Sequence, residues 1–292
     1  MSIDKLQTRI RKLKNPSALD LGIMPEHIPS HLRQAHSTLA AAYQQFCEEL
    51  LAGLKEVIPA VRFNLGASAA YGPDGMLVLS QLLRFAKDCG YYVMLDIPDA
   101  RSQMDAQRNA DVLFCNETAF CFDGIITSVY IGSDGLRPYV EHPDRADRDV
   151  FVITRTSNRS AQELQDLLTG SRLVHMATAD IVNRYSEAAV GRCGYSQIAA
   201  VAAAASPDSI KALRAKYKNL FLLLDGYDYP NANAKNCSFA FDRLGHGAVA
   251  CAGLSITGAW QEGDCEGEDF VPAALDAAER MKRNLTRYVT IL

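Results

Sequence analysis

The chain has 292 residues, and its composition, with 48% hydrophobic and 22% charged residues, is ordinary for a globular protein. The formal net charge is −4 with both signs interspersed, so no basic stripe is present and we expect no binding to nucleic acid or to a membrane. No apolar run approaches the roughly 20 residues that a membrane-spanning helix needs. Residues 1–14 are basic but lack the apolar stretch of a signal peptide. We therefore expect a cytoplasmic protein that begins with a short amphipathic helix.

Strand-like and helix-like segments alternate along the chain, a pattern typical of a mainly parallel sheet. Apolar runs predict eight strands, at residues 18–23, 60–65, 91–96, 125–129, 150–155, 198–205, 220–224 and 247–252. Helix signals predict helices near 37–57, 73–90, 160–168 and 173–190, after 206–208, up to 241, and over 270–285. Eight strand–helix units without a linker predict an α/β fold, a single (β/α)8 TIM barrel over residues 1–292. A doubly wound open sheet is the alternative.

The segment 91–101, Y-Y-V-M-L-D-I-P-D-A-R, is the best place to look for chemistry. Its apolar run suits a strand buried on both faces, and Pro98 ends that strand because proline cannot donate to a ladder. Asp96 is then at the C-terminal end of the strand, where barrels carry their active sites. The alternative is that Asp96 is only a turn or N-cap residue for the next helix.

Cysteine and histidine spacing gives no indication of a metal site. The eight cysteines contain no C-x-x-C pair and the six histidines are dispersed. We expect reduced thiols without disulfides, and no metal. The cysteines are Cys47, Cys89, Cys115, Cys121, Cys193, Cys237, Cys251 and Cys265.

Several dispersed but collinear segments share their pattern with one family. They are Asn15-Pro16-Ser17, the G-L-K-E-V-I-P-A-V of residues 53–61, the A-Y-G-P-D-G-M of 70–76, residues 150–158 and the G-Y-S of 194–196. Together they resemble the bacterial type 2 orotidine 5′-phosphate decarboxylases, over nearly the whole chain. The resemblance implies a barrel that works as a homodimer in pyrimidine biosynthesis, with the active site near the dimer interface. It also implies a lyase that releases CO2 without a cofactor.

The catalytic array of that family is incomplete in this chain. The family uses a lysine–aspartate–lysine–aspartate array of alternating charges, and its first lysine falls on Arg62. Its D-x-K-x-x-D segment falls on Asp96, Pro98 and Arg101, so only the first aspartate is retained. Pro98 cannot donate a proton, and a guanidinium holds its proton too firmly to act as an acid. Arg62, Asp96 and Arg101 are therefore the candidate catalytic residues of a degenerate array.

The substrate-binding positions of the family are also altered. Met24 replaces its first-strand aspartate, although Asp20 lies an even number of residues earlier and could point the same way. At the phosphate end, Pro230 replaces a glutamine and Leu254 replaces the phosphate-binding arginine. The candidate substrate contacts that remain are Asp20, Thr156, Ser157, Asn158 and Gly226.

Three functions stay open from the sequence. The first is a decarboxylase-like pseudoenzyme that binds another small molecule, a nucleotide or carboxylate, or partners an active subunit. The second is an active decarboxylase with displaced groups, and the third is a barrel enzyme for a carboxylated substrate without phosphate. A purely structural ion-pair cluster of Arg62, Asp96 and Arg101 is the alternative to any site.

Overall fold

The computed structural model describes residues 1–115, 117–263 and 267–292. Eight parallel strands close into a barrel in the order β1-β10-β9-β8-β5-β4-β3-β2. The strands are β1 (Ser17–Asp20), β2 (Ala60–Asn64), β3 (Tyr92–Asp96), β4 (Gly124–Ser128), β5 (Asp149–Ile153), β8 (Ile198–Ala203), β9 (Leu222–Asp225) and β10 (Ala248–Ala252). The predicted TIM barrel is confirmed, and the doubly wound alternative is wrong.

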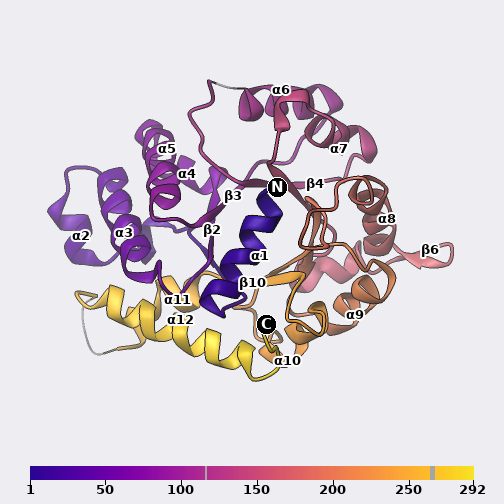
Figure 1. Cartoon of the computed structure of the whole chain (residues 1–292). Coiled ribbons are helices and arrows are strands. Elements are labelled where there is room, and N and C mark those ends of the chain that lie inside the picture. The colour runs from indigo at the N-terminus through magenta and orange to yellow at the C-terminus, as the bar shows by residue number, and fades with distance from the viewer. Residues whose placement is uncertain (116, 264–266) are drawn as a thin grey trace.

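Helices surround the barrel as an outer ring (Figure 1). They are α2 (Ser30–Ala35), α3 (Leu39–Leu54), α4 (Leu65–Ser68), α5 (Pro73–Asp88), α6 (Gln103–Phe114), α7 (Ser133–Val140), α8 (Val174–Ser186), α9 (Pro207–Lys216), α10 (Ala234–Cys237), α11 (Leu254–Thr257) and α12 (Phe270–Thr286), whereas α1 (Ser2–Leu13) lies across one end of the barrel. The apolar faces of the long ring helices pack on the outward side chains of the strands in one large hydrophobic cluster. This packing fixes the C-terminal ends of the strands at one rim.

The barrel interior is filled by side chains that alternate along each strand. Tyr92, Phe151 and Phe221 are large interior residues, and Phe151 meets the other two rings edge to face. Gly124 makes room for them, because a Cβ there would lie 2.9 Å from the Tyr92 hydroxyl and 3.0 Å from the Phe151 ring. Alternation with a period of two therefore fills most of the N-terminal half of the barrel interior with apolar groups, with Asp149 as a polar exception, and places polar side chains at the last inward positions.

Helix α1 covers the N-terminal end of the barrel (Figure 1). Its apolar residues Ile3, Leu6 and Ile10 are fully buried against the interior side chains. The start of the helix is held by a hydrogen bond from the Ser2 amide to the Asp147 carbonyl. The N-terminal amphipathic helix was thus correctly expected, and it closes the barrel on this side.

One predicted helix is wrong and two helices were missed. The segment 160–168 was expected to be helical, but it contains a short 3-10 turn, Arg159–Glu163, followed by a small antiparallel hairpin of β6 (Leu168–Thr169) and β7 (Arg172–Leu173). Its leucines do not face a core, since Leu168 is 70% exposed. Helices α6 and α7 were not assigned from the sequence.

The cysteines that the structure describes are free thiols, with Cys47, Cys237 and Cys251 buried. The prediction for Cys265 lies outside the described residues. Among the helices of the described part of the chain, none combines the length and the apolar character that crossing a bilayer requires.

Candidate functional site at the barrel mouth

Asp96 ends strand β3 at the C-terminal rim of the barrel, as predicted. Its register partner on the neighbouring strand is Asn64, and its side chain is 15% exposed. It does not cap the next helix, because the N-cap of α6 is Ser102, whose hydroxyl accepts from the Asp105 amide. Asp96 therefore points into the mouth, and the interpretation as a helix cap is wrong.

The mouth is organised around the guanidinium of Arg62, which three carboxylates share. Nη2 of Arg62 lies 3.0 Å from Oδ2 of Asp96 and 3.5 Å from Oδ2 of Asp20. Nη1 lies 2.5 Å from Oδ1 of Asp225. These residues come from β1, β2, β3 and β9, so strands distant in sequence build one charge cluster. We call Asp20, Arg62, Asp96 and Asp225 the mouth cluster.

Burial and charge set the protonation of the mouth cluster. Burial raises the pKa of Asp96 to about 6, against the lowering effect of Arg62 and with further raising by Asp20 and Asp225. Burial likewise raises the pKa of Asp20, and Arg62 opposes that shift. Burial alone would lower the pKa of Arg62, but Asp20 and Asp225 reverse this and hold it well above its usual value. The cluster thus combines one permanent cation with a carboxyl group whose pKa is raised to about 6.

Asn64 is a member of the site that the sequence reasoning missed. Its Nδ2 donates to Oδ2 of Asp96 at 3.2 Å, while its Oδ1 accepts from the Ala67 amide and caps α4. Both amide atoms are used, so the side chain is fixed and in turn orients Asp96. The signal was available, because Asn64 lies two residues after Arg62 and therefore on the same face of the strand.

The loop after β5 brings one of its three predicted contacts to the mouth. The Ser157 hydroxyl donates to the Asp225 carbonyl at 2.6 Å, which joins this loop to the end of β9. Thr156 instead bonds locally, from its hydroxyl to Oδ1 of Asn158 at 2.5 Å and from its amide to Oε1 of Gln165 at 2.8 Å. Ser157 is therefore next to the mouth cluster, whereas Thr156 and Asn158 stabilise the loop itself.

The loops after β9 and β10 hold each other through Asp228. Its Oδ2 accepts from the Gly253 amide at 2.7 Å, and its Oδ1 accepts from the Ser255 hydroxyl. Gly226 adopts a φ of 78°, a conformation that suits glycine, in the turn that leads to Asp228. Leu254 is 46% exposed beside this contact. The donors at this end of the mouth are thus occupied by a carboxylate of the chain itself.

Two positions predicted from the resemblance lie outside the cluster. Arg101 is exposed, and no ion pair of Arg101 is found within the described residues. Of the expected group of Arg62, Asp96 and Arg101, only Arg62 and Asp96 are in contact. Met24 is 39% exposed, while Asp20 reaches Arg62. The first-strand carboxylate is therefore supplied by Asp20, in the direction that strand alternation indicated.

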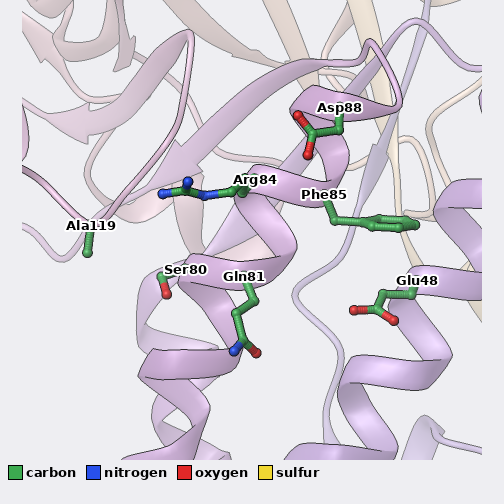
Figure 2. Close-up of a pocket in the computed structure, with 7 residues that line it drawn as sticks. All are labelled: Glu48, Ser80, Gln81, Arg84, Phe85, Asp88 and Ala119. Atoms are coloured by element: carbon green, nitrogen blue, oxygen red, sulfur yellow. The ribbon is translucent and has the colours of Figure 1, made fainter.

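The hollow shown in Figure 2 is separate from the mouth. Five of its wall residues, among them Arg84 and Asp88, come from α5, and the others are Glu48 of α3 and Ala119. None of them belongs to the end of a barrel strand. Within residues 1–115, 117–263 and 267–292, no group of three or more His, Cys, Asp or Glu side chains is placed to hold a metal ion.

Comparison with known proteins adds the family relationship. No family model matches the chain. An orotidine 5′-phosphate decarboxylase of Petrotoga mobilis is 27% identical over 285 residues, which cover 96% of this chain and 97% of that protein. One of Rhodopirellula baltica is 29% identical over 248 residues, or 81% and 82% of the two chains. This chain is a homologue of the orotidine 5′-phosphate decarboxylases.

Solved structures of that name share the fold. The orotidine 5′-monophosphate decarboxylase of Plasmodium berghei superimposes with a TM-score of 0.78 at 12% identity, covering 98% of each chain. The Leishmania donovani OMP decarboxylase gives 0.72 at 22% identity, covering 98% of this chain and 99% of that one. The resemblance inferred from short motifs is confirmed, and the relationship extends over the whole barrel.

Proposed function

We propose that the chain is a decarboxylase homologue that has lost the decarboxylation reaction and keeps a small-molecule site at the barrel mouth. The observation that carries this proposal is the set of ion pairs that the Arg62 guanidinium makes. Its guanidinium is shared by Asp20, Asp96 and Asp225, where the family's array has a lysine. A guanidinium so held does not release a proton near neutral pH. The position of the second lysine is Pro98, which is exposed and carries no acid group.

The phosphate end supports the same proposal independently. Charge-assisted bonds to phosphate need free donors or an arginine. Here the Gly253 amide and the Ser255 hydroxyl already donate to Asp228, and Leu254 stands where the family has arginine. A phosphate entering this end would meet the carboxylates of Asp225 and Asp228, and like charges repel. We infer that a phosphorylated ligand is disfavoured for reasons separate from the missing proton donor.

The test is a steady-state assay of the purified chain with orotidine 5′-phosphate, following the loss of substrate absorbance. We expect no turnover above background, because each missing preorganised group costs on the order of 10²–10³-fold in rate. Pro98→Lys alone should not restore activity, since the phosphate end stays altered. Turnover that Asp96→Ala abolishes would return the chain to the active decarboxylases with displaced groups.

The homology also supports proposals on assembly and location. We propose one domain over residues 1–292 that works in the cytoplasm as a homodimer with the mouths near the shared interface. A two-fold interface brings the same residues of both copies together, so the exposed Arg101 loop is expected to approach the partner. Light scattering at micromolar concentration tests this, and a monomer alone would contradict it.

A further inference from the structure

We propose that a hollow beside the mouth cluster binds the carboxylate of a small organic ligand through the guanidinium of Arg159. The hollow has a volume of about 400 Å³, within the usual range for small-molecule sites. Its walls come from three loops, with Ser157, Arg159 and Gln162 after β5, Ala205 after β8, and Tyr229 and Asn231 after β9. This inference rests on the proposed function, in that it names the ligand class for a retained site.

The charge of the hollow comes from Arg159 alone. Arg155 also lines it, but its Nε and Nη2 lie 3.0 Å and 2.8 Å from the two carboxylate oxygens of Asp166, so its charge is neutralised. Arg159 has neither an ion pair nor a hydrogen-bonded acceptor in the part of the chain that the structure describes, and it is exposed. A guanidinium is a planar fork of donors that matches an oxyanion. The hollow therefore offers one uncompensated positive charge.

A carboxylate fits this charge better than a phosphate does. One guanidinium balances the single charge of a carboxylate, and the amides of Gln162 and Asn231 can add neutral hydrogen bonds. A phosphate dianion would keep excess negative charge beside Asp225, whose backbone carbonyl is already bonded to Ser157. Because the hollow offers a single positive charge, we expect it to bind a monoanion more tightly than a dianion.

Ser157 lies in the wall between the hollow and the mouth cluster. Its hydroxyl bonds to the backbone of Asp225, whose carboxylate holds Arg62. The contact is close, since a Cβ on Gly226 would lie 2.6 Å from the Ser157 Cβ and 2.8 Å from the Tyr229 ring. A planar ligand can rest on the half-exposed ring of Tyr229 with its carboxylate at Arg159.

The test is calorimetric titration of the full chain with orotate, a planar ring with one carboxylate. Inorganic phosphate and uridine monophosphate are the comparison ligands. We expect orotate to bind, and Arg159→Gln to weaken it by about tenfold or more, as expected for a lost charge-assisted hydrogen bond. Ala205→Leu, which fills the hollow without changing charge, should weaken it too. Arg243→Gln removes another exposed arginine, which precedes β10, and should leave the orotate affinity unchanged.

Several results would overturn the inference. These are no orotate binding to the wild type at millimolar concentration, an Arg159→Gln affinity within twofold of the wild type, or tighter binding of phosphate or uridine monophosphate than of orotate. If Asp96→Asn weakens orotate while Arg159→Gln does not, the ligand sits at the mouth cluster alone. That outcome would reject the Arg159 site and leave the proposed function intact.

Discussion

The two ends of the barrel place carboxylates in opposite surroundings. At the N-terminal end, beneath α1, Asp149 is fully buried among apolar side chains and accepts from the Tyr92 hydroxyl at 2.5 Å, and burial raises its pKa well above the usual value. At the C-terminal mouth, Asp96 faces Arg62 and stays partly exposed. The same strand alternation produces both. The two ends differ in what lies over them. Helix α1 closes the N-terminal end, whereas short loops surround the C-terminal mouth.

This difference separates stability from ligand chemistry. The closed end contributes buried apolar area, which stabilises the fold in proportion to the surface removed from water. The mouth holds several charged side chains close together. Their burial carries a free-energy penalty for desolvation, but their protonation can respond to pH and to a bound ligand. Changes at the two ends should therefore have distinct effects, and the following predictions test that separation.

The largest effect is expected at the closed end. Leu6→Ala empties part of the contact between α1 and the barrel interior, and such buried truncations cost about 2–5 kcal/mol of unfolding free energy. Urea unfolding measures this, with the 59% exposed Leu77→Ala on α5 as the matched control at about 0.5 kcal/mol or less. Orotate affinity of the folded protein should not change. A weakened ligand site in Leu6→Ala would show that the two ends are coupled.

The next effect is a pH dependence from the mouth. The folded pKa of Asp96 is raised from 3.8 to about 6, so between these values the folded protein binds more protons than the unfolded chain. The unfolding free energy should therefore fall as pH rises from about 4 to 6 and be flat above, by roughly 3 kcal/mol at about 1.4 kcal/mol per unit. The raised pKa of Asp20 acts in the same direction.

Substitution identifies the source of that slope. Asp96→Asn should flatten the curve between pH 4 and 6 and stabilise the protein at pH 8, because the amide needs no desolvation of charge. Asp99→Asn changes an exposed carboxylate three residues away and should keep the wild-type slope. An unchanged slope in Asp96→Asn would mean that the mouth cluster does not titrate in this range.

The smallest effect is expected at the phosphate end. Asp228→Ala frees the Gly253 amide and the Ser255 hydroxyl and removes a negative charge. The affinity for inorganic phosphate should rise a few-fold, since an exposed charge interaction is worth about 1 kcal/mol or less. Calorimetry measures this, with Asp208→Ala, a 95% exposed carboxylate on α9, as control. A loss of phosphate affinity would contradict the interpretation that Asp228 occupies the donors at this end of the mouth.

The strands could be predicted from the sequence because both faces of each are buried. Apolar runs such as Leu222–Leu224 mark such strands without needing any partner. The segment 160–168 failed for the opposite reason, because its leucines resemble a helical stripe but lie at the surface in a turn and a hairpin. The spacing of apolar residues in a segment does not show whether that segment packs against the hydrophobic core.

The mouth cluster could be predicted only in part. Asp96 ends β3, and its position after an apolar run indicates the rim. Arg62, in the middle of β2, and Asp20 could be named only through the family resemblance. That Asp225 would share Arg62 depends on barrel closure, which brings residues 163 positions apart within 2.5 Å. The pairing of Asp228 with the start of α11 likewise depends on two loops meeting.

The most direct test of lost catalysis is a single-turnover measurement with the protein in excess over carboxyl-labelled orotidine 5′-phosphate, in which released CO2 is counted. Excess protein removes weak binding and slow product release as explanations for inactivity. We expect release at the uncatalysed rate, because neither Pro98 nor the tightly paired Arg62 can protonate a carbanion. Release approaching one equivalent that disappears in Asp96→Ala would contradict this and make the chain an active decarboxylase.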